Sequence, residues 1–496
     1  MSISVSPFRL GIGTGLLALS VIGIVLSDFR GVSLHDLESS TFEYLERIRD
    51  DRKSHTLQYF KEIESAASRV SKDQVIHRFF EEQYASPMQI GTGGGELDRH
   101  FVTEYGWFYD LLFIDSTGFV FHSILQEDDY LDNLFVGNLA QTKLSKSLRE
   151  ATSTQFSDFE YYYPSGESAA FFIFPVLDRN IVAGWLVLQC AINQVNTILT
   201  DQSQYSRTTE VYLVNSDTLM LSDSRFIEDR TILKVKVDTE SVRNAMRSSR
   251  GENIITDYRG ARVYSSYESF EYFNTVWIII AEIDESEALT QHYERHAEFF
   301  NARIPSYLLD ASPSSSNTIR LEKPTKRVDV NEWAKAKPLE LLYTPGVSTC
   351  TAYSIHYPQN FAYLAHISPT DAVYKNNGVV TRLFLGDRGS NFVRGLTGRM
   401  RHYDISLSEL PQLQFTIVAN HLNSFEKIVQ QLIEQGADID QVRFAYNPGA
   451  DFADVYTDVS DNHDTIIWKT KSGKSIVFRS DYPSLGDVVR LILREL

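Results

Sequence analysis

The chain has 496 residues, of which 43% are hydrophobic and 23% are charged, and this is the composition of a folded globular protein. Its 65 acidic residues outnumber its 47 basic residues and give a formal net charge of −18, so the surface would repel phosphate backbones and we expect no nucleic-acid partner. Two cysteines are too few for a Cys-rich zinc module, and the length predicts about two to four domains.

A membrane anchor is predicted at the N-terminus. Residues 10–26 read LGIGTGLLALSVIGIVL, a run of 17 residues without a charge, and about 17–25 apolar residues are needed to cross a bilayer. We therefore expect a tail over residues 1–9 and a transmembrane helix over residues 10–27, with a cleaved signal peptide as the alternative. The best later candidate, residues 276–281 (VWIIIA), is six residues long and predicts a buried strand instead. The chain is thus expected to cross the membrane once.

The first large domain, residues 28–295, begins with a predicted helix and continues as short strands. Residues 33–84 are expected to form a long helix or a helix pair, because apolar residues such as Leu45 and Ile48 recur at helical spacing. Over residues 105–284, short apolar runs separated by turn residues predict a mainly antiparallel α+β domain. These runs are residues 111–114, 169–176, 182–188, 211–214 and 277–283, and a helix is predicted at 239–247.

A second α+β domain is predicted over residues 338–496. Residues 310–318 read DASPSSSNT, which is polar and poor in apolar residues, so residues 296–337 are interpreted as a linker. An amphipathic helix is expected at 424–435 and a closing helix at 485–496. The predicted strands of this domain are residues 350–357, 360–367, 415–420, 442–446, 465–470 and 475–479.

Five segments of the first domain share a pattern with a known class of proteins. They are YGWFYDLLFIDS at 105–116, DFEYYYPSGESAAFFIFP at 158–175, TEVYLVNSDTLMLSDSR at 209–225, TILKVKVDT at 231–239 and IIIAEIDESEA at 278–288. In combination they resemble the extracytoplasmic double Cache domain of bacterial chemoreceptors and sensor cyclases. The resemblance implies two stacked sheet modules, of which the membrane-distal one usually binds a small ligand.

The ligand site implied by this resemblance is assigned to Trp107, Tyr109, Asp158, Tyr161 and Tyr163. Aromatic rings and a carboxylate suit a small amine or polar metabolite, through hydrophobic contact, cation–π attraction and charge pairing. The alternative is that these aromatic residues form the core of a strand-rich module. Sensors of this class often dimerise through their long helix, so the resemblance also predicts a homodimer.

The compartment follows from the residues after the last predicted strand of this domain. Double Cache sensors usually cross the membrane again at this point, but residues 290–307 read TQHYERHAEFFNARIPSY, which is charged and cannot span. Both domains are therefore expected in the periplasm, on a single-pass protein of the bacterial inner membrane.

Cysteine and histidine occupy neighbouring predicted strands of the second domain. The segment TPGVSTCTAYSIHYPQNFAYLAH at 344–366 places Cys350 at the head of one strand and His366 on the next, with YPQN as the turn. A hairpin can bring the two side chains within reach, as a nucleophile–base pair requires, and the imidazole can hold the thiol as thiolate. A third group must orient the imidazole. His356 is the competing base and is expected at the surface or rim.

This segment is similar to the chemoreceptor glutamine deamidase (CheD) family over residues 338–480. That family has Thr, Gly, Cys and an Ala-His pair at the spacing of Thr344, Gly346, Cys350 and Ala365-His366. The resemblance implies that Cys350, His366 and Thr344 form a triad that deamidates glutamine side chains of a protein such as a chemoreceptor. Neither a metal nor an organic cofactor is implied.

Departures from the family pattern keep other readings open. The family's Gly-Ser before the cysteine is Ser348-Thr349 here, which removes a glycine from the oxyanion turn, and LFLGDRGSNFVRGLTGRMR at 383–401 has no counterpart. The predicted function is a membrane-anchored extracytoplasmic small-ligand sensor that carries a glutamine deamidase. In one alternative, the CheD-like domain is a degenerate protein-interaction module. In another, that domain is cytoplasmic and the predicted topology is wrong.

Overall fold

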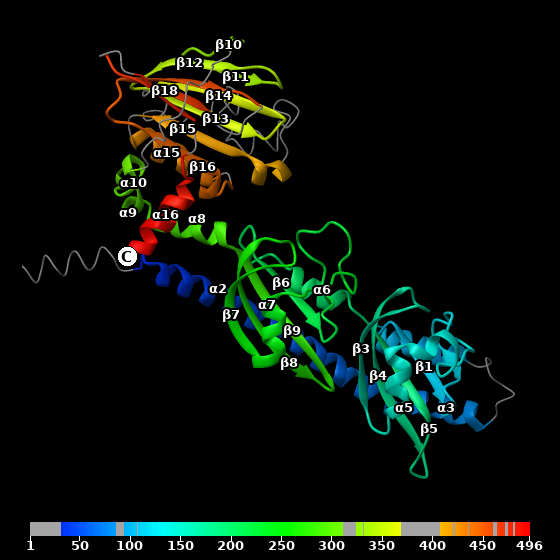
Figure 1. The fold of residues 1–496 in the computed structure, drawn as a ribbon. Helices are drawn as coiled ribbons and strands as arrows, with labels where there is room; N and C mark the ends of the chain where they lie inside the picture. The colour runs from blue at the N-terminus through cyan, green and yellow to red at the C-terminus, as the bar shows by residue number, and fades with distance from the viewer. Residues whose placement is uncertain are drawn as a thin grey trace, which may run out of the picture. The chain divides into compact units, whose positions relative to one another are not determined.

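The computed structural model describes residues 31–85, 94–106, 108–310, 324–330, 332–368, 407–419, 422–434, 436–459, 464–471, 475–479 and 482–496. The chain divides into two compact units, one formed by Ser40–Glu285 and the other by Met1–Ser39 with Ser286–Leu496. Figure 1 colours both in chain order. The predicted membrane anchor at 10–27 and the unmatched stretch at 383–401 lie outside the described residues. No described helix is both long enough and apolar enough to cross a membrane.

Three helices precede the first sheet, and the first two form the helix pair that the sequence predicts. They are α2 (Leu34–Val70), α3 (Gln74–Ala85) and α4 (Gly94–Tyr105). Asp73 caps α3, because its Oδ1 accepts the backbone N–H of Val75 at 2.8 Å. Its other oxygen lies 2.8 Å from His100 Nε2 and accepts the Tyr105 hydroxyl at 3.0 Å. The same carboxylate therefore starts α3 and holds α4 against it.

The first sheet module spans residues 74–191. Its antiparallel strands are ordered β2-β1-β5-β4-β3. The elements are β1 (Asp110–Asp115), β2 (Val120–Ser123), η2 (Gly137–Gln141), α5 (Lys143–Glu150), β3 (Gln155–Tyr162), β4 (Glu167–Asp178) and β5 (Ile181–Ala191). On one face, Phe79 and Phe80 of α3 contact Phe113 of β1. The other face packs against Leu144 and Leu148 of α5.

The second sheet module spans residues 193–284 and has antiparallel strands in the order β6-β9-β8-β7. Its elements are α6 (Asn193–Thr200), β6 (Glu210–Asn215), α7 (Glu240–Ser248), β7 (Arg250–Thr256), β8 (Arg262–Tyr272) and β9 (Thr275–Asp284). Val242 and Ala245 of α7 pack on one face of the sheet. Thr239, the first residue of the helix predicted at 239–247, caps α7 by accepting the Val242 N–H. β7 was not predicted, because its sequence RGENIIT is mostly polar and lacks apolar alternation.

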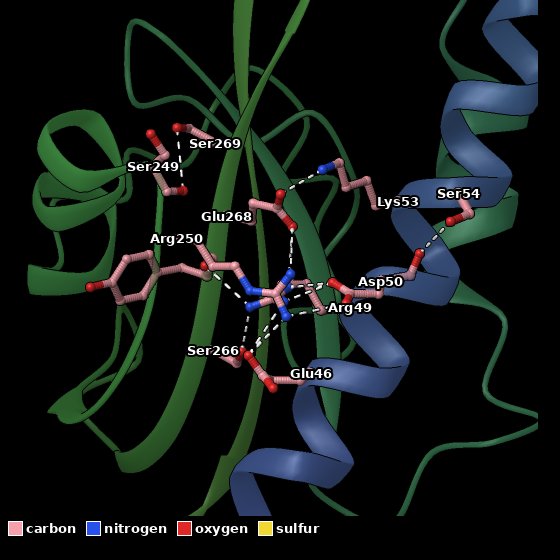
Figure 2. A network of polar contacts seen from close by, with 11 residues as sticks. Glu46, Arg49, Asp50, Lys53, Ser54, Ser249, Arg250, Ser266, Glu268 and Ser269 are labelled. Carbon is pink, nitrogen blue, oxygen red and sulfur yellow. Dashed lines mark hydrogen bonds and ion pairs between the residues drawn. The ribbon is translucent and has the colours of Figure 1, made fainter.

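A buried arginine joins α2 to the second sheet module (Figure 2). Arg49 is fully buried, and its guanidinium donates to Ser266 Oγ and to Asp50 Oδ1, both at 2.7 Å. Glu268 lies 3.8 Å from Arg49 and 2.6 Å from Lys53. A buried charge is tolerated when it is paired and hydrogen-bonded in this way. The network determines which side of α2 lies against β8.

The second unit contains two five-stranded sheets that share one core. Their orders are β10-β12-β17-β18-β19 and β11-β14-β13-β15-β16. The strands are β10 (Lys326–Arg327), β11 (Trp333–Ala336), β12 (Leu342–Val347), β13 (Thr351–Tyr357), β14 (Phe361–Ile367), β15 (Gln414–Ala419), β16 (Val442–Tyr446), β17 (Phe452–Thr457), β18 (Thr465–Lys469) and β19 (Ser475–Arg479). Ala352 and Leu364 of one sheet pack with Val455 and Trp468 of the other. All strands predicted for this domain are present.

Helices complete the second unit. They are α8 (Glu285–Arg295), α9 (Ala297–Asn301), α10 (Ile304–Asp310), η3 (Leu407–Gln412), α15 (Leu422–Glu434), η4 (Ile439–Gln441) and α16 (Leu485–Glu495). Phe425 of α15 stacks on Phe444 of β16 with ring centroids 4.0 Å apart, on the side of the sheet away from the shared core. β10 and β11 lie inside the stretch interpreted as a linker, and β11 pairs with β14. Both are short, so the composition of that stretch did not reveal them.

Candidate functional site

The residues predicted to bind a ligand do not share one environment. Trp107 lies outside the described residues. Tyr161 and Tyr163 are 62% and 67% exposed, because the residue between them, Tyr162, points into the core and successive side chains of a strand alternate. Tyr109 is half-buried, and its hydroxyl takes part in the polar site described below.

Asp158, the carboxylate of the predicted ligand set, contacts protein groups. Its Oδ1 accepts the indole N–H of Trp277 at 2.8 Å, and its Oδ2 lies 3.7 Å from Lys143 Nζ. Lys143 also pairs with Asp217 at 2.9 Å. Burial raises the pKa of Asp158, and the Lys143 charge opposes that rise. Because Trp277 and Asp217 belong to the second sheet module, Asp158 joins the two modules of the first unit.

A row of residues crosses four strands of the first sheet module. Asp110 of β1 lies opposite Gln189 of β5, Gln189 opposite Phe171 of β4, and Phe171 opposite Ser157 of β3. Directly opposed residues share a face of the sheet. Phe171 packs in the same cluster as Leu144 of α5, so the row faces α5.

Two more carboxylates reach this row from the segment after β2. Tyr162 donates its hydroxyl hydrogen to Asp129 Oδ2 at 2.7 Å, and Tyr109 donates to Glu127 Oε1 at 2.7 Å. The backbone of the segment folds back onto β1, where Asp110 Oδ1 accepts one of its N–H groups at 3.1 Å. Three carboxylates therefore gather at one end of the sheet.

Five side chains here have a buried polar atom without a hydrogen-bond partner among the described residues: Glu127 (Oε2), Asp129 (Oδ1), Ser145 (Oγ), Ser157 (Oγ) and Gln189 (Oε1). Ser145 belongs to α5, which packs on β3. We call these five residues and Asp110 the polar site. An unsatisfied buried polar group costs about 1–3 kcal/mol, so several in one place mark a position that a ligand or water completes.

Burial raises the pKa values of the three carboxylates, and neighbouring negative charges add to the rise for Asp129 and Glu127. Burial raises the pKa of Asp129, the Tyr162 hydroxyl opposes this, and the charges of Asp110 and Glu127 add to the rise, which brings the pKa to about 6. Burial also raises the pKa values of Asp110 and Glu127. In the part of the chain that the structure describes, no group of three or more His, Cys, Asp or Glu side chains is arranged to hold a metal ion.

The second sheet module carries a buried polar cluster under α7, in which Glu282 has partners for both of its oxygens. Glu282 of β9 is buried, and its two oxygens accept from the Tyr212 hydroxyl at 3.0 Å and from Ser265 Oγ at 2.8 Å. Ser265 in turn lies 2.7 Å from Ser241 Oγ of α7. Burial raises the pKa of Glu282 to about 8. Among the described residues of this module, open buried polar atoms remain on Asn215, Thr218 and Asn253, and of these Asn215 and Asn253 offer an amide N–H rather than a carboxylate oxygen.

Sequence reasoning missed most of the polar site. The acidic run QEDDYLD at 126–132 was a usable signal, because it follows the strand predicted at 111–114 and holds more carboxylates than a turn requires. Gln189 had no such signal, since its position opposite Asp110 depends on the β1–β5 register.

The predicted triad of the second unit lies between its two sheets. Thr344 belongs to β12 of one sheet and His366 to β14 of the other, and both are buried. Thr344 Oγ1 lies 2.7 Å from His366 Nδ1 and donates its own proton to the Val328 carbonyl at 2.8 Å. Because that proton is engaged, Oγ1 accepts from Nδ1–H, and this assigns the lone pair of the ring to Nε2. Nε2 is buried and has no hydrogen-bond partner among the described residues.

Cys350 approaches His366 from the neighbouring strand. Ala352 lies directly opposite His366 in the β13–β14 ladder, and Cys350 lies two residues earlier, just before β13 begins at Thr351. If the extended chain continues to Cys350, the two residues are diagonal neighbours roughly 7–8 Å apart. Cys350 is a half-buried free thiol. Burial raises the pKa of Cys350, and burial lowers the pKa of His366. Both directions favour a neutral thiol beside a neutral imidazole, rather than the thiolate that the sequence suggested.

His356 is not at the surface, and that prediction was wrong. It is 2% exposed, and its Nε2 lies 2.9 Å from Asp464 Oδ1, while Ser354 binds the other oxygen of the same carboxylate. Even-numbered positions of β13 face the second sheet, which explains the burial. His356 is six residues from Cys350, or about 20 Å along an extended strand, so it is too far away to act as its base.

Comparisons with known proteins return likenesses of fold over about half of the chain. No protein-family model matches the sequence, and no curated protein matches it. The periplasmic sensory domain of the Campylobacter jejuni chemoreceptor Tlp1 is 16% identical, with 51% of this chain and 98% of that chain covered and a TM-score of 0.37. The ligand-binding domain of the Pseudomonas fluorescens chemoreceptor CtaA, in complex with L-leucine, is 12% identical, with 51% and 97% covered and a TM-score of 0.34.

A third similar structure is an extracellular ligand binding receptor from Desulfohalobium retbaense. It is 14% identical with a TM-score of 0.32, and the match covers 50% of this chain but only 39% of the receptor. These neighbours are thus a periplasmic sensory domain, a chemoreceptor ligand-binding domain and an extracellular ligand binding receptor. Identities and scores this low do not indicate what the present chain binds.

Proposed function

We propose that the first unit is a sensor domain that binds a small polar molecule at the polar site of the first sheet module. The observation that carries this proposal is a set of five buried polar atoms, on β3, β5, α5 and the segment after β2, that have no hydrogen-bond partner among the described residues. The double Cache resemblance makes this module the membrane-distal one, where such sensors usually bind their ligand. The hydrophobic run at residues 10–26 supports a single-pass inner-membrane anchor with both domains in the periplasm.

A ligand screen tests the sensor proposal. Thermal unfolding of the purified protein is followed with a panel of amino acids, amines, carboxylates and sugars, since a ligand that binds the folded state raises the melting temperature. Gln189→Leu, which replaces an open acceptor by an apolar group, should abolish the shift. Gln58→Leu on the exposed side of α2 is the matched control and should leave the shift unchanged. A ligand shift that survives Gln189→Leu would place the binding site elsewhere.

The topology needs a separate test, because the anchor lies outside the described residues. A periplasm-active reporter and a cytoplasm-active reporter are fused in turn to the C-terminus. The proposal expects activity of the first alone. Strong activity of the cytoplasmic reporter would refute the periplasmic placement of the second unit.

A second candidate function, glutamine deamidation by Cys350, is favoured by the orientation of His366. Thr344 holds Nδ1, so Nε2 is the atom that can accept a proton, and Cys350 is its diagonal neighbour. We propose that Nε2 takes the thiol proton and that sulfur attacks the side-chain amide carbon of a glutamine. The proton then passes to the leaving nitrogen, which departs as ammonia. Water, deprotonated by Nε2, finally breaks the C–S bond and releases glutamate and the thiol.

Alkylation of Cys350 against pH tests this chemistry. Cys190 is a buried free cysteine and is the internal control. The deamidase proposal expects the alkylation rate to depend on His366, with an altered pH profile in His366→Ala and Thr344→Val. A slow reaction that is insensitive to both substitutions would favour the alternative, in which the CheD-like domain is a protein-interaction module. A reactive pair would justify a search for glutamine targets in chemoreceptors and other periplasm-facing proteins.

A further inference from the structure

The open positions of the polar site are rich in hydrogen-bond acceptors. Glu127 Oε2 and Asp129 Oδ1 are carboxylate oxygens, Gln189 Oε1 is an amide oxygen, and Ser145 and Ser157 contribute hydroxyls that can donate or accept. All but Glu127 are at least nine-tenths buried. A ligand that satisfies them must bring N–H groups to the acceptor oxygens of Glu127, Asp129 and Gln189, and the two hydroxyls can take up further N–H groups.

The charge of the site is negative and is not balanced by the protein. The charges acting on Asp129 are those of Asp110 and Glu127, and within the described ranges no Lys or Arg forms an ion pair with any of the three. Both oxygens of Asp110 accept hydrogen bonds, from Ser123 and from backbone N–H groups. Asp110 therefore adds negative charge to the site but offers no open oxygen to a ligand. Glu127 and Asp129 each keep one oxygen for the ligand.

We propose that the ligand of the polar site is an organic dication, a diamine or a guanidinium-bearing amine, held by Glu127, Asp129 and Gln189. The assignment rests on the proposed function, that this site binds a small molecule. A zwitterionic amino acid fits less well, because its carboxylate would face the three protein carboxylates with only the Ser145 and Ser157 hydroxyls to donate to it. One cationic end can pair with each open carboxylate, and the amide oxygen and hydroxyls can accept the remaining N–H groups.

An unliganded site of this kind stores repulsion, which can be measured without knowing the ligand. Asp129 is faced by Asp110 from β1, by Glu127 from its own segment and by the neutral Tyr162 from β3, while Glu167 of β4 acts on Glu127. A carboxyl whose pKa is raised in the folded state loses stability as pH rises through that pKa. Asp129→Asn removes one charge and keeps an acceptor for Tyr162. It should therefore raise the melting temperature at about pH 7.5, by about 2–4 °C, and this gain should shrink as pH falls and vanish below about pH 4.

The experiment combines this variant with defined probes. The full purified chain, with Asp129→Asn, Glu127→Gln and the exposed control Asp132→Asn on the same segment, is unfolded with and without 1,4-diaminobutane, agmatine, L-alanine, succinate or Mg²⁺ at millimolar concentration. We expect at least one of the two dications to raise the melting temperature of the wild type and of Asp132→Asn. Neither should shift Asp129→Asn or Glu127→Gln by more than a small fraction of that amount.

Each other outcome counts against the inference. A shift with L-alanine, succinate or Mg²⁺ but with neither dication would overturn the dication while leaving a ligand site in place. A loss of melting temperature in unliganded Asp129→Asn at about pH 7.5 would show that the carboxylate is structural and would overturn the inference as well. If no probe shifts the wild type, the dication assignment fails. The proposed sensor function fails with it only when the wider ligand panel also gives no shift sensitive to Gln189→Leu.

Discussion

Replacing Arg49 by methionine tests whether the buried network of Figure 2 holds α2 on the second sheet module. Arg49→Met keeps an apolar stem of similar length and removes the guanidinium. The buried hydroxyl of Ser266 and the carbonyl of Tyr267 then lose their donor at 2.7 and 3.3 Å. Glu268, 16% exposed, loses one cation but keeps Lys53 at 2.6 Å. The exposed partner Asp50, 45% accessible, regains water.

The expected loss of stability follows from which partners stay buried. Removing one member of a buried ion pair costs about 3–5 kcal/mol, because the remaining charge is left uncompensated. Here Glu268 retains Lys53, so we expect the lower end of that range, about 3 kcal/mol. Arg47→Met is the matched control, since Arg47 is exposed on the same helix, and a surface substitution should change stability by less than about 0.5 kcal/mol.

Hydrogen exchange measured by mass spectrometry localises the effect. Peptides that cover α2 and β8 should lose protection in Arg49→Met by an amount equivalent to about 3 kcal/mol, while peptides of the second unit are unchanged. The reasoning would be refuted by a loss below about 1 kcal/mol, the value expected of an exposed ion pair. An equal loss in Arg47→Met would refute it too, because the effect would then be one of helix propensity or net charge.

Three further outcomes follow from single side chains. Thr344→Val leaves Nδ1–H of His366 without its acceptor, so the free energy of unfolding in urea should fall by about 1–3 kcal/mol and the pH profile of Cys350 alkylation should change. Wild-type behaviour in both measurements would remove Thr344 from the triad. Glu282 has a pKa of about 8 in the folded protein against an ordinary 4.5, so its contribution to stability is complete below about pH 4.5 and is lost as pH rises through 8. The melting temperatures of the wild type and Glu282→Gln should therefore converge toward low pH. A constant difference between the two melting temperatures across this pH range would contradict the prediction. Tyr161→Ala, at a 62% exposed position, should leave both stability and ligand-induced thermal shifts within error; a lost shift would restore the aromatic ligand set.

Local pattern was sufficient for most elements of the fold. The apolar run at 182–188 lies within β5, and the amphipathic run at 424–435 matches α15 to within two residues. The strands that were not predicted are β2, β3, β7, β8, β10, β11, β12 and β17. β7 and β11 share one physical reason: RGENIIT and WAKA are short and carry charges, so neither shows two full periods of alternation. β7 forms because it pairs with β8 across a hairpin, and β11 forms because it pairs with β14, which lies farther along the chain.

The two candidate sites differ in how far sequence could reach them. Thr344 and His366 were chosen by family spacing, and the structure places them 2.7 Å apart from two different sheets. The aromatic ligand set was chosen by residue type alone, and its members proved to be exposed, bound to protein groups or outside the described residues. Residue type reports what a side chain can bind, but the face of the strand decides whether it meets a ligand or solvent.

Sequence by itself determined the α+β character of both domains, the long helical region before the first sheet, and the positions of most strands along the chain, because these depend on periodicities of a few residues. Only the tertiary structure decided that Gln189 lies opposite Asp110, that the segment after β2 brings Glu127 and Asp129 to the same end of the sheet, and that their open oxygens have no protein partner among the described residues. Register, loop path and hydrogen-bond satisfaction are properties of the whole packed domain, since each depends on groups that are distant in sequence and meet only after folding.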